Sequence, residues 1–186
     1  MKKTEIVPAL MEHAAHIASQ MRRADREEVA ACGKGPLAAI SDCLITAAAA
    51  WTGLVDDEPV CMFGVSPSIN FLNGVGIPWL LGTDKIRENA LAFLRRNKTY
   101  VGLMLDIFPR LINFVDVRNH LGILWLVWLG FRIDNSRTVD VGGFPFYRFE
   151  MERPQSNRSQ GRIVAHGPRQ MIFGRFYEAK EKRNGA

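Results

Sequence analysis

The segment that decides the architecture of this chain is Asn119-His-Leu-Gly-Ile-Leu-Trp-Leu-Val-Trp-Leu-Gly130-Phe131. An Asn can cap a helix by accepting a backbone N–H from the first turn, and a Gly can adopt the left-handed conformation that ends one. The segment therefore predicts a helix that is capped within residues 116–119, ends at Leu129 and buries one stripe, formed by Leu121, Leu124, Trp125 and Trp128.

Towards the N-terminus, an apolar strand is expected over residues 111–115, directly before this helix. An earlier strand over 75–81 leads through Gly82-Thr83-Asp84 into a helix over 86–97, which Thr83 or Asp84 can cap. The pattern of residues 100–108 leaves open whether that helix continues or breaks. This region therefore alternates strand and helix, which is typical of α/β proteins.

The flanking regions complete the pattern. A short strand over 4–7 precedes three helices, of which the second follows Asp25 and carries Glu28 three residues on, as in a capping box. A hairpin follows the third helix, and the chain ends its folded part with strands over 131–133 and 144–151 around a loop that contains Gly142-Gly143. The element order βααα-ββ-β-α-β-α-ββ predicts an α/β fold with a mixed central sheet and helices on both faces.

Charge divides the chain into two parts. The formal net charge is +5, and residues 152–186 alone hold eight basic and three acidic residues. Residues 1–151 are therefore neutral overall and are expected to form one domain, followed by a polar linker and a basic C-terminal tail. Within the tail, residues 169–182 place Met171, Phe173 and Phe176 among basic side chains. This amphipathic segment is expected to dock on the domain or on a protein partner, and a membrane surface and nucleic acid are the alternatives.

The three cysteines, Cys32, Cys43 and Cys61, fit neither a disulfide framework nor a zinc site, and we expect buried free thiols. No signal peptide is expected, and the longest strongly apolar run, residues 121–131, is shorter than the roughly 20 residues that cross a bilayer. These features predict a cytoplasmic protein without a transmembrane segment.

The element order resembles the GNAT fold of acyl-CoA-dependent N-acetyltransferases. In that family's motif B an Asn opens a helix and Gly-Phe closes it, and Asn119 and Gly130-Phe131 stand at the matching spacing. Within this fold the chain is similar to the small GNAT-like proteins of T7-like bacteriophages, the internal virion protein A-like group. That likeness is carried by residues 21–27, 76–83 and 115–131, and the GNAT resemblance as a whole covers residues 4–151.

The resemblance implies that acetyl-CoA binds where two neighbouring strands diverge, with its pyrophosphate at the next helix N-terminus. It assigns this role to Leu80, Leu81, Gly82, Thr83, Lys85, Arg87, Asn119 and Trp125. The four histidines are dispersed along the chain, so no metal site is expected. The family pattern Gln/Arg-x-x-Gly-x-Gly/Ala is degraded, because the segment 80–85 holds one glycine, and a plain strand-to-helix turn is the alternative reading. The Tyr that protonates the leaving thiolate in many members is replaced by Leu126.

An amine must be neutral to attack a thioester, so the reaction needs a carboxylate or a carboxylate-bound water as base. Asp116, Asp25 and Glu28 are the candidate catalytic residues, with Asp106 as a further carboxylate. The alternative is that Asp25, Glu28 and Asp116 serve as helix caps or ion-pair partners.

Two functions follow from the resemblance. The first is an N-acetyltransferase that moves an acetyl group from acetyl-CoA to an amine; encoded by a phage, it would act in the host cytoplasm. The second is a non-catalytic virion or assembly protein with the same fold, acting through protein contacts, for which the degraded glycine pattern and Leu126 are the evidence.

Overall fold

The computed structural model describes residues 3–69, 73–88 and 90–154. In these ranges the chain forms seven strands and six helices, in the order β1 (Thr4–Pro8), α1 (Met11–Ser19), α2 (Arg23–Ala31), α3 (Pro36–Thr46), β2 (Ala49–Val55), β3 (Glu58–Pro67), β4 (Val75–Gly82), α4 (Lys85–Glu88), α5 (Ala90–Ile107), β5 (Arg110–Asp116), α6 (His120–Leu129), β6 (Arg132–Val141) and β7 (Phe144–Glu152). The predicted α/β fold with a mixed sheet is confirmed.

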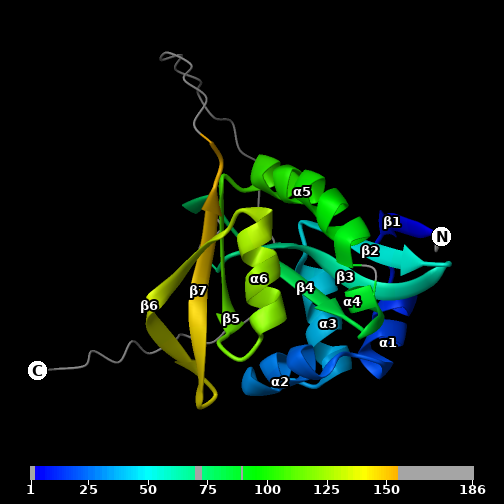
Figure 1. Ribbon diagram of the computed structural model, residues 1–186, viewed down its shortest axis with the longest axis horizontal. Helices are drawn as coiled ribbons and strands as arrows, with labels where there is room; N and C mark the ends of the chain where they lie inside the picture. The colour runs from blue at the N-terminus through cyan, green and yellow to red at the C-terminus, as the bar shows by residue number, and fades with distance from the viewer. Residues whose placement is uncertain (1–2, 70–72, 89, 155–186) are drawn as a thin grey trace, which may run out of the picture.

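The strands form one sheet in the order β1-β2-β3-β4-β5-β7-β6 (Figure 1). Neighbouring strands are antiparallel except β4 and β5, which are parallel. Parallel neighbours need a crossover, and α4 and α5 supply it between these two strands. The parallel pair therefore lies in the middle of the sheet, with hairpins on either side.

Helices cover both faces of the sheet, and side chains that alternate along the strands pack against them. Met62 and Leu81 belong to the core beneath α1 and α3. Their neighbours in sequence, Phe63 and Leu80, face the opposite side, which α5 and α6 cover (Figure 1). This period-two alternation gives the domain two cores, one on each face of the sheet.

Several element boundaries differ from the sequence-based expectation. α5 continues without a break from Ala90 to Ile107, so the question about residues 100–108 is answered. β6 extends to Val141, because Gly142 and Gly143 adopt positive φ angles and turn the chain tightly into β7. The prediction of a loop between residues 133 and 144 was therefore wrong, since most of this range belongs to β6.

The helix α6 has the predicted caps but not the predicted buried stripe. The Asn119 side chain accepts the Gly122 N–H at 3.0 Å, and Gly130 has a φ of 101°. Trp125 is buried, whereas Leu124 is 66% exposed and Trp128 is 40% exposed. The helix is apolar nearly all round, so its periodicity did not identify the buried face.

Other expectations have mixed outcomes. Cys61 is buried and Cys43 half-buried, but Cys32 is exposed, so the prediction of three buried thiols was wrong. Within the described ranges no single helix is long and apolar enough to cross a membrane, although α2 and α3 together, with a bend of 76°, pass that test by length and composition. The tail segment 169–182 lies outside the described residues.

Candidate active site

The strands β4 and β5 pair only at their first residues. Their register joins Val75 to Arg110 and Gly76 to Leu111, and it ends there. β4 continues beside β3 to Gly82, while β5 continues beside β7 to Asp116 (Figure 1). The two central strands therefore diverge and leave an opening in the middle of the sheet.

The backbone of β4 presents polar groups to this opening. The Pro78 carbonyl accepts a hydrogen bond from Asn113 Nδ2 of β5 at 2.9 Å, and the Gly82 N–H donates to the Asp25 carboxylate at 2.8 Å. Backbone groups alternate in direction along a strand, so Leu80, midway between them, also points its N–H and C=O away from β3. Among the residues that the structure describes, no strand pairs with Leu80 on that side, and Pro78 has no N–H, so the Leu80 amide is the backbone donor that β4 presents to the opening.

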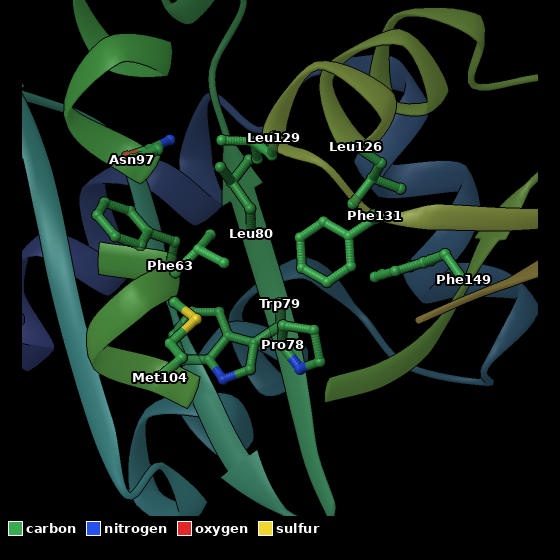
Figure 2. Close-up of a pocket in the computed structure, with 11 residues that line it drawn as sticks. Phe63, Pro78, Trp79, Leu80, Asn97, Met104, Leu126, Leu129, Phe131 and Phe149 are labelled. Carbon is green, nitrogen blue, oxygen red and sulfur yellow. The ribbon is translucent and has the colours of Figure 1, made fainter. Parts of the chain in front are cut away.

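A pocket of about 90 Å³ lies at the opening. Leu80 of β4, Leu126 and Leu129 of α6 and Phe131 line it, together with residues of α5 (Figure 2). The lining is almost entirely apolar. Leu126, at the position that resembles the family's Tyr, thus faces the pocket without offering a proton.

Two residues named in the pocket wall each have a buried polar atom without a hydrogen-bond partner among the residues that the structure describes. These atoms are Asn97 Oδ1, an acceptor on α5, and Trp79 Nε1, a donor on β4. Asn97 is only 4% exposed. An unpaired buried polar group costs about 1–3 kcal/mol. The Trp79 side chain packs against the α1–α3 core, so its Nε1 lies on the other face of the sheet from Leu80 and the pocket.

Asp25 does not cap α2 as a capping box would require. The helix begins at Arg23, and Asp25 lies in its first turn, 1% exposed. Its carboxylate binds Arg22 Nη2 at 2.7 Å and the Gly82 N–H at 2.8 Å. Burial raises the pKa of Asp25, while the Arg22 guanidinium and the Gly82 amide act in the opposite direction. With these two donors already bound, Asp25 is a structural carboxylate that holds the end of β4.

Glu28 lies one turn further along α2 and reaches the end of β5. Its Oε1 accepts hydrogen bonds from Asn119 Nδ2 at 2.8 Å and from the Asp116 N–H at 3.3 Å. Burial raises the pKa of Glu28 from 4.5 to about 7, against the effect of these hydrogen bonds. A half-buried carboxyl with this pKa can take up a proton near neutral pH, which is the property of a general base.

The remaining carboxylates are less suited to this role. Asp116 is 2% exposed and forms a forked ion pair with Arg118, whose hydrogen bonds lower the pKa of the Asp116 carboxyl. Asp106 is exposed and pairs with Arg153 at 3.3 Å, at the far end of α5. The structure thus brings Asp25, Glu28 and Asp116 together around the opening and leaves Asp106 outside.

The expected pyrophosphate loop has few free amides. The Gly82 N–H is bound to Asp25, and the Thr83 N–H donates to the Val60 carbonyl at 2.8 Å. The Thr83 hydroxyl also bonds to Val60 and caps no helix. Because α4 already begins at Lys85, the amides of Ile86 and Arg87 are bound to the carbonyls of Thr83 and Asp84. Four amides in residues 82–87 are therefore bound within the protein and are not available to a diphosphate.

The other residues assigned to acetyl-CoA are distributed around the opening. Leu81 faces the α1–α3 core, and Lys85 pairs with Glu58 at 2.6 Å. Arg87 is exposed, Asn119 is occupied as the cap of α6, and Trp125 is buried beneath that helix. Of the eight residues that the resemblance assigns to acetyl-CoA, Leu80 lines the pocket and the other seven do not.

Some features of the site were not recognised in the sequence. Asn97, Trp79 and Asn113 acquire their positions only through the fold, but Pro78 is a local signal, because Pro within a strand indicates an open edge. The family's Gln/Arg-x-x-Gly-x-Gly/Ala spacing also fits the segment from Arg87 to Ala92, with Ala90 and Ala92 in place of both glycines.

Solved structures with this arrangement are numerous. Aminoglycoside acetyltransferase AAC(6')-Ib, solved with ribostamycin and coenzyme A, matches with a TM-score of 0.59 at 13% identity over 81% of this chain and 94% of that one. A GNAT-family acetyltransferase from Bacillus anthracis matches with a TM-score of 0.59 at 9% identity, over 82% and 98% of the two chains. The ribosomal-protein-S18-alanine N-acetyltransferase of Escherichia coli matches with a TM-score of 0.55 at 10% identity, over 86% and 99%.

This chain has the GNAT fold. No protein-family model matches its sequence, and the search of curated proteins gave no match. At such low identity the likeness concerns the fold, and the site of this GNAT-fold protein must be judged from its own residues.

Proposed function

We propose that this protein is an N-acetyltransferase that binds an acetyl thioester, with acetyl-CoA as the donor, in the opening between β4 and β5. One observation supports this most directly: the opening exposes the backbone of Leu80 beside an apolar pocket. An extended thioester arm can complete the free edge of β4 through main-chain hydrogen bonds. The similar aminoglycoside acetyltransferase was solved with coenzyme A.

The donor supplies an electrophilic acyl carbon and a thiolate leaving group. The Leu80 N–H is the backbone donor available to the oxyanion that forms when an amine attacks this carbon. Because the sheet holds this N–H fixed, the N–H need not reorient as the oxyanion forms. Removal of such a hydrogen-bond donor typically slows turnover about 10²- to 10³-fold.

Glu28 is the proposed general base. It lies on α2 and hydrogen-bonds to Asn119, the cap of α6, and to the Asp116 N–H at the end of β5, so the amine would approach from this end of the opening. Glu28 takes the amine proton as the C–N bond forms and the C–S bond breaks. The departing thiolate takes its proton from solvent, because Leu126 has none to give.

A pair of substitutions tests the role of the Leu80 amide. In Leu80→Pro the N–H is lost on the open side of β4, where the ladder with β3 does not use it. Leu80→Ala keeps the N–H and loses only side-chain contacts. We expect acetyl transfer to a panel of amines to fall about 10²-fold in Leu80→Pro and far less in Leu80→Ala. Equal rates in the two variants would rule out this role for the amide.

A non-catalytic role is the second candidate function, and specific observations favour it. The amides of Gly82 and Thr83 are occupied, and Leu126 replaces the proton donor. The GNAT-fold domain would then act as a virion or assembly protein, in keeping with the resemblance to the internal virion protein A-like group of T7-like phages. Calorimetry with acetyl-CoA separates the two functions, because binding weaker than about 1 mM would exclude the transferase.

The C-terminal segment 169–182 is proposed as a docking arm for the domain itself or for a protein partner, in the host cytoplasm or the virion. Its apolar side chains stand among basic ones, and more of them are present than phosphate contacts need. Co-purification of the full chain and of a chain ending at residue 151 tests this. Identical partners and an identical oligomeric state in both would exclude a docking role.

A further inference from the structure

We infer that the acceptor amine carries an oxyanion, a carboxylate or a phosphate, at the end remote from its reacting nitrogen, and that four arginines on one face of β5, β7 and β6 bind this group. This inference rests on the proposed acetyl transfer and specifies the class of acceptor that the site takes. The four residues, Arg110 of β5, Arg132 and Arg137 of β6 and Arg148 of β7, are the arginine cluster.

The strands β5, β7 and β6 form one end of the sheet, and one of their faces lies outside both hydrophobic cores (Figure 1). Leu111 and Val115 of β5 belong to the core beneath α5 and α6, so Ile112 and Phe114 face the opposite side. Both are half-buried, and neither belongs to a core among the described residues. The helices α1 and α3 pack on β3 instead. This face of β5, β7 and β6 is therefore accessible to a ligand.

The arginine cluster lies on this face, around a buried carboxylate. Strand pairing places Glu150 between Ile112 and Arg132, and residues directly opposite each other share a face. Glu150 is 5% exposed. Its carboxylate accepts hydrogen bonds from Arg148 Nη2 at 2.6 Å, from Arg110 Nη2 at 2.8 Å and from Arg132 Nη2. Three guanidiniums therefore share one carboxylate.

Positive charge exceeds negative charge in the cluster. Among the described residues, its four guanidiniums pair with three carboxylates, those of Glu150, Glu152 and Asp134. Burial lowers the pKa of Arg148, and repulsion by the other three arginines lowers it further. A guanidinium presents five N–H donors in a plane that matches a carboxylate or a phosphate. A bound oxyanion would neutralise the excess charge and accept hydrogen bonds from donors that Glu150 does not use.

The cluster and the proposed base lie along the same strand. Glu28 accepts the N–H of Asp116 at the end of β5, and Val29 beside it packs against the α1–α3 core on this face of the sheet. Four residues of β5 separate Asp116 from Ile112, which is about 13 Å at 3.3 Å per residue. Arg148 pairs with the residue midway between them. An acceptor with its amine at Glu28 and its oxyanion at the cluster is therefore an extended molecule, with on the order of 10 Å between the two groups.

Calorimetry on the full chain tests this inference with two probes, ω-aminooctanoate and ω-aminooctanamide. Their chains match the expected span, and they differ only in the end group, which is charged in the first and neutral in the second. We expect the carboxylate to bind at least about tenfold more tightly, because its hydrogen bonds to guanidiniums are charge-assisted. The phosphate monoester of ω-aminooctanol shows which oxyanion the cluster prefers. If neither oxyanion probe binds more tightly than the amide probe, the inference is overturned.

Acetyl transfer from acetyl-CoA to the same probes separates this inference from the proposed function. Equal kcat/KM for the amide probe and the oxyanion probes would overturn the inference and leave the proposed function intact. Tight binding of the oxyanion probes without transfer to any probe would instead contradict the proposed function, and the acceptor role of the cluster with it.

Substitutions locate the oxyanion site. Arg132→Gln and Arg148→Gln each remove one guanidinium, and we expect each to reduce the advantage of the carboxylate probe over the amide probe at least about fivefold. The Arg132 side chain is 79% exposed, so Arg132→Gln is expected to fold even if Arg148→Gln does not; thermal unfolding checks both. Arg95→Gln removes an exposed charge from α5, on the other face of the sheet, and should leave the advantage unchanged. An unchanged advantage in folded Arg132→Gln would overturn the inference.

Discussion

Asp25 and Gly82, 57 residues apart in sequence, are joined by a buried hydrogen bond of 2.8 Å from the Gly82 N–H to the Asp25 carboxylate. One turn further along α2, the Glu28 carboxylate accepts hydrogen bonds from the Asn119 side-chain amide and from the Asp116 N–H at the end of β5. The helix α2 therefore binds the end of β4 through one carboxylate and the end of β5 through the next. It spans the two diverging strands and fixes the width of the opening between them.

Asp25→Ala is expected to destabilise the domain strongly. It leaves the buried Arg22 guanidinium without its partner and the Gly82 N–H unsatisfied. Removing one member of a buried ion pair costs about 3–5 kcal/mol, measured here by urea unfolding. Arg23→Ala is the matched control on the same helix, because its pair with Glu27 is exposed and contributes less than about 1 kcal/mol. Equal effects of the two substitutions would show that Asp25 does not hold β4.

Glu28→Gln is expected to change how stability depends on pH. The folded-state pKa of Glu28 is about 7, above the ordinary 4.5, so the folded state binds more protons between these values. The free energy of unfolding of the unmodified protein therefore falls as pH rises from about 4.5 to about 7, and the loss is complete above that range. The shift corresponds to about 3 kcal/mol.

The glutamine keeps an oxygen for Asn119 and does not ionise. Glu28→Gln should thus be more stable than the unmodified protein at pH 8 and no more stable at pH 4, measured by chemical unfolding at both pH values. A parallel pH dependence in the two proteins would show that Glu28 titrates normally.

Leu126→Trp is expected to block the pocket, because Leu126 forms part of its wall. Calorimetry should find no donor binding in this variant. Val127→Trp places the same side chain on the exposed side of α6, where Val127 is 56% exposed, and should bind the donor normally. Normal binding by Leu126→Trp would place the donor elsewhere.

The sequence was sufficient to predict the order of elements, the caps of α6 and the α/β fold, because these depend on local patterns such as Asn119 and Gly130. The role of Asp25 could not be predicted, since its position three residues before Glu28 has the same pattern as a capping box and its partner Gly82 is distant in sequence. The buried, unpaired Oδ1 of Asn97 was missed for the same reason: only the packing of α5 in the folded domain buries it.

Amide hydrogen exchange at Leu80 tests the central claim, that the opening between β4 and β5 receives the thioester arm. With a saturating excess of acetyl-CoA or S-acetylpantetheine, we expect the Leu80 amide resonance to shift and its exchange to slow, while the amide of Leu81, already paired with β3, changes little. Bound ligand with an unaltered Leu80 amide would contradict the account.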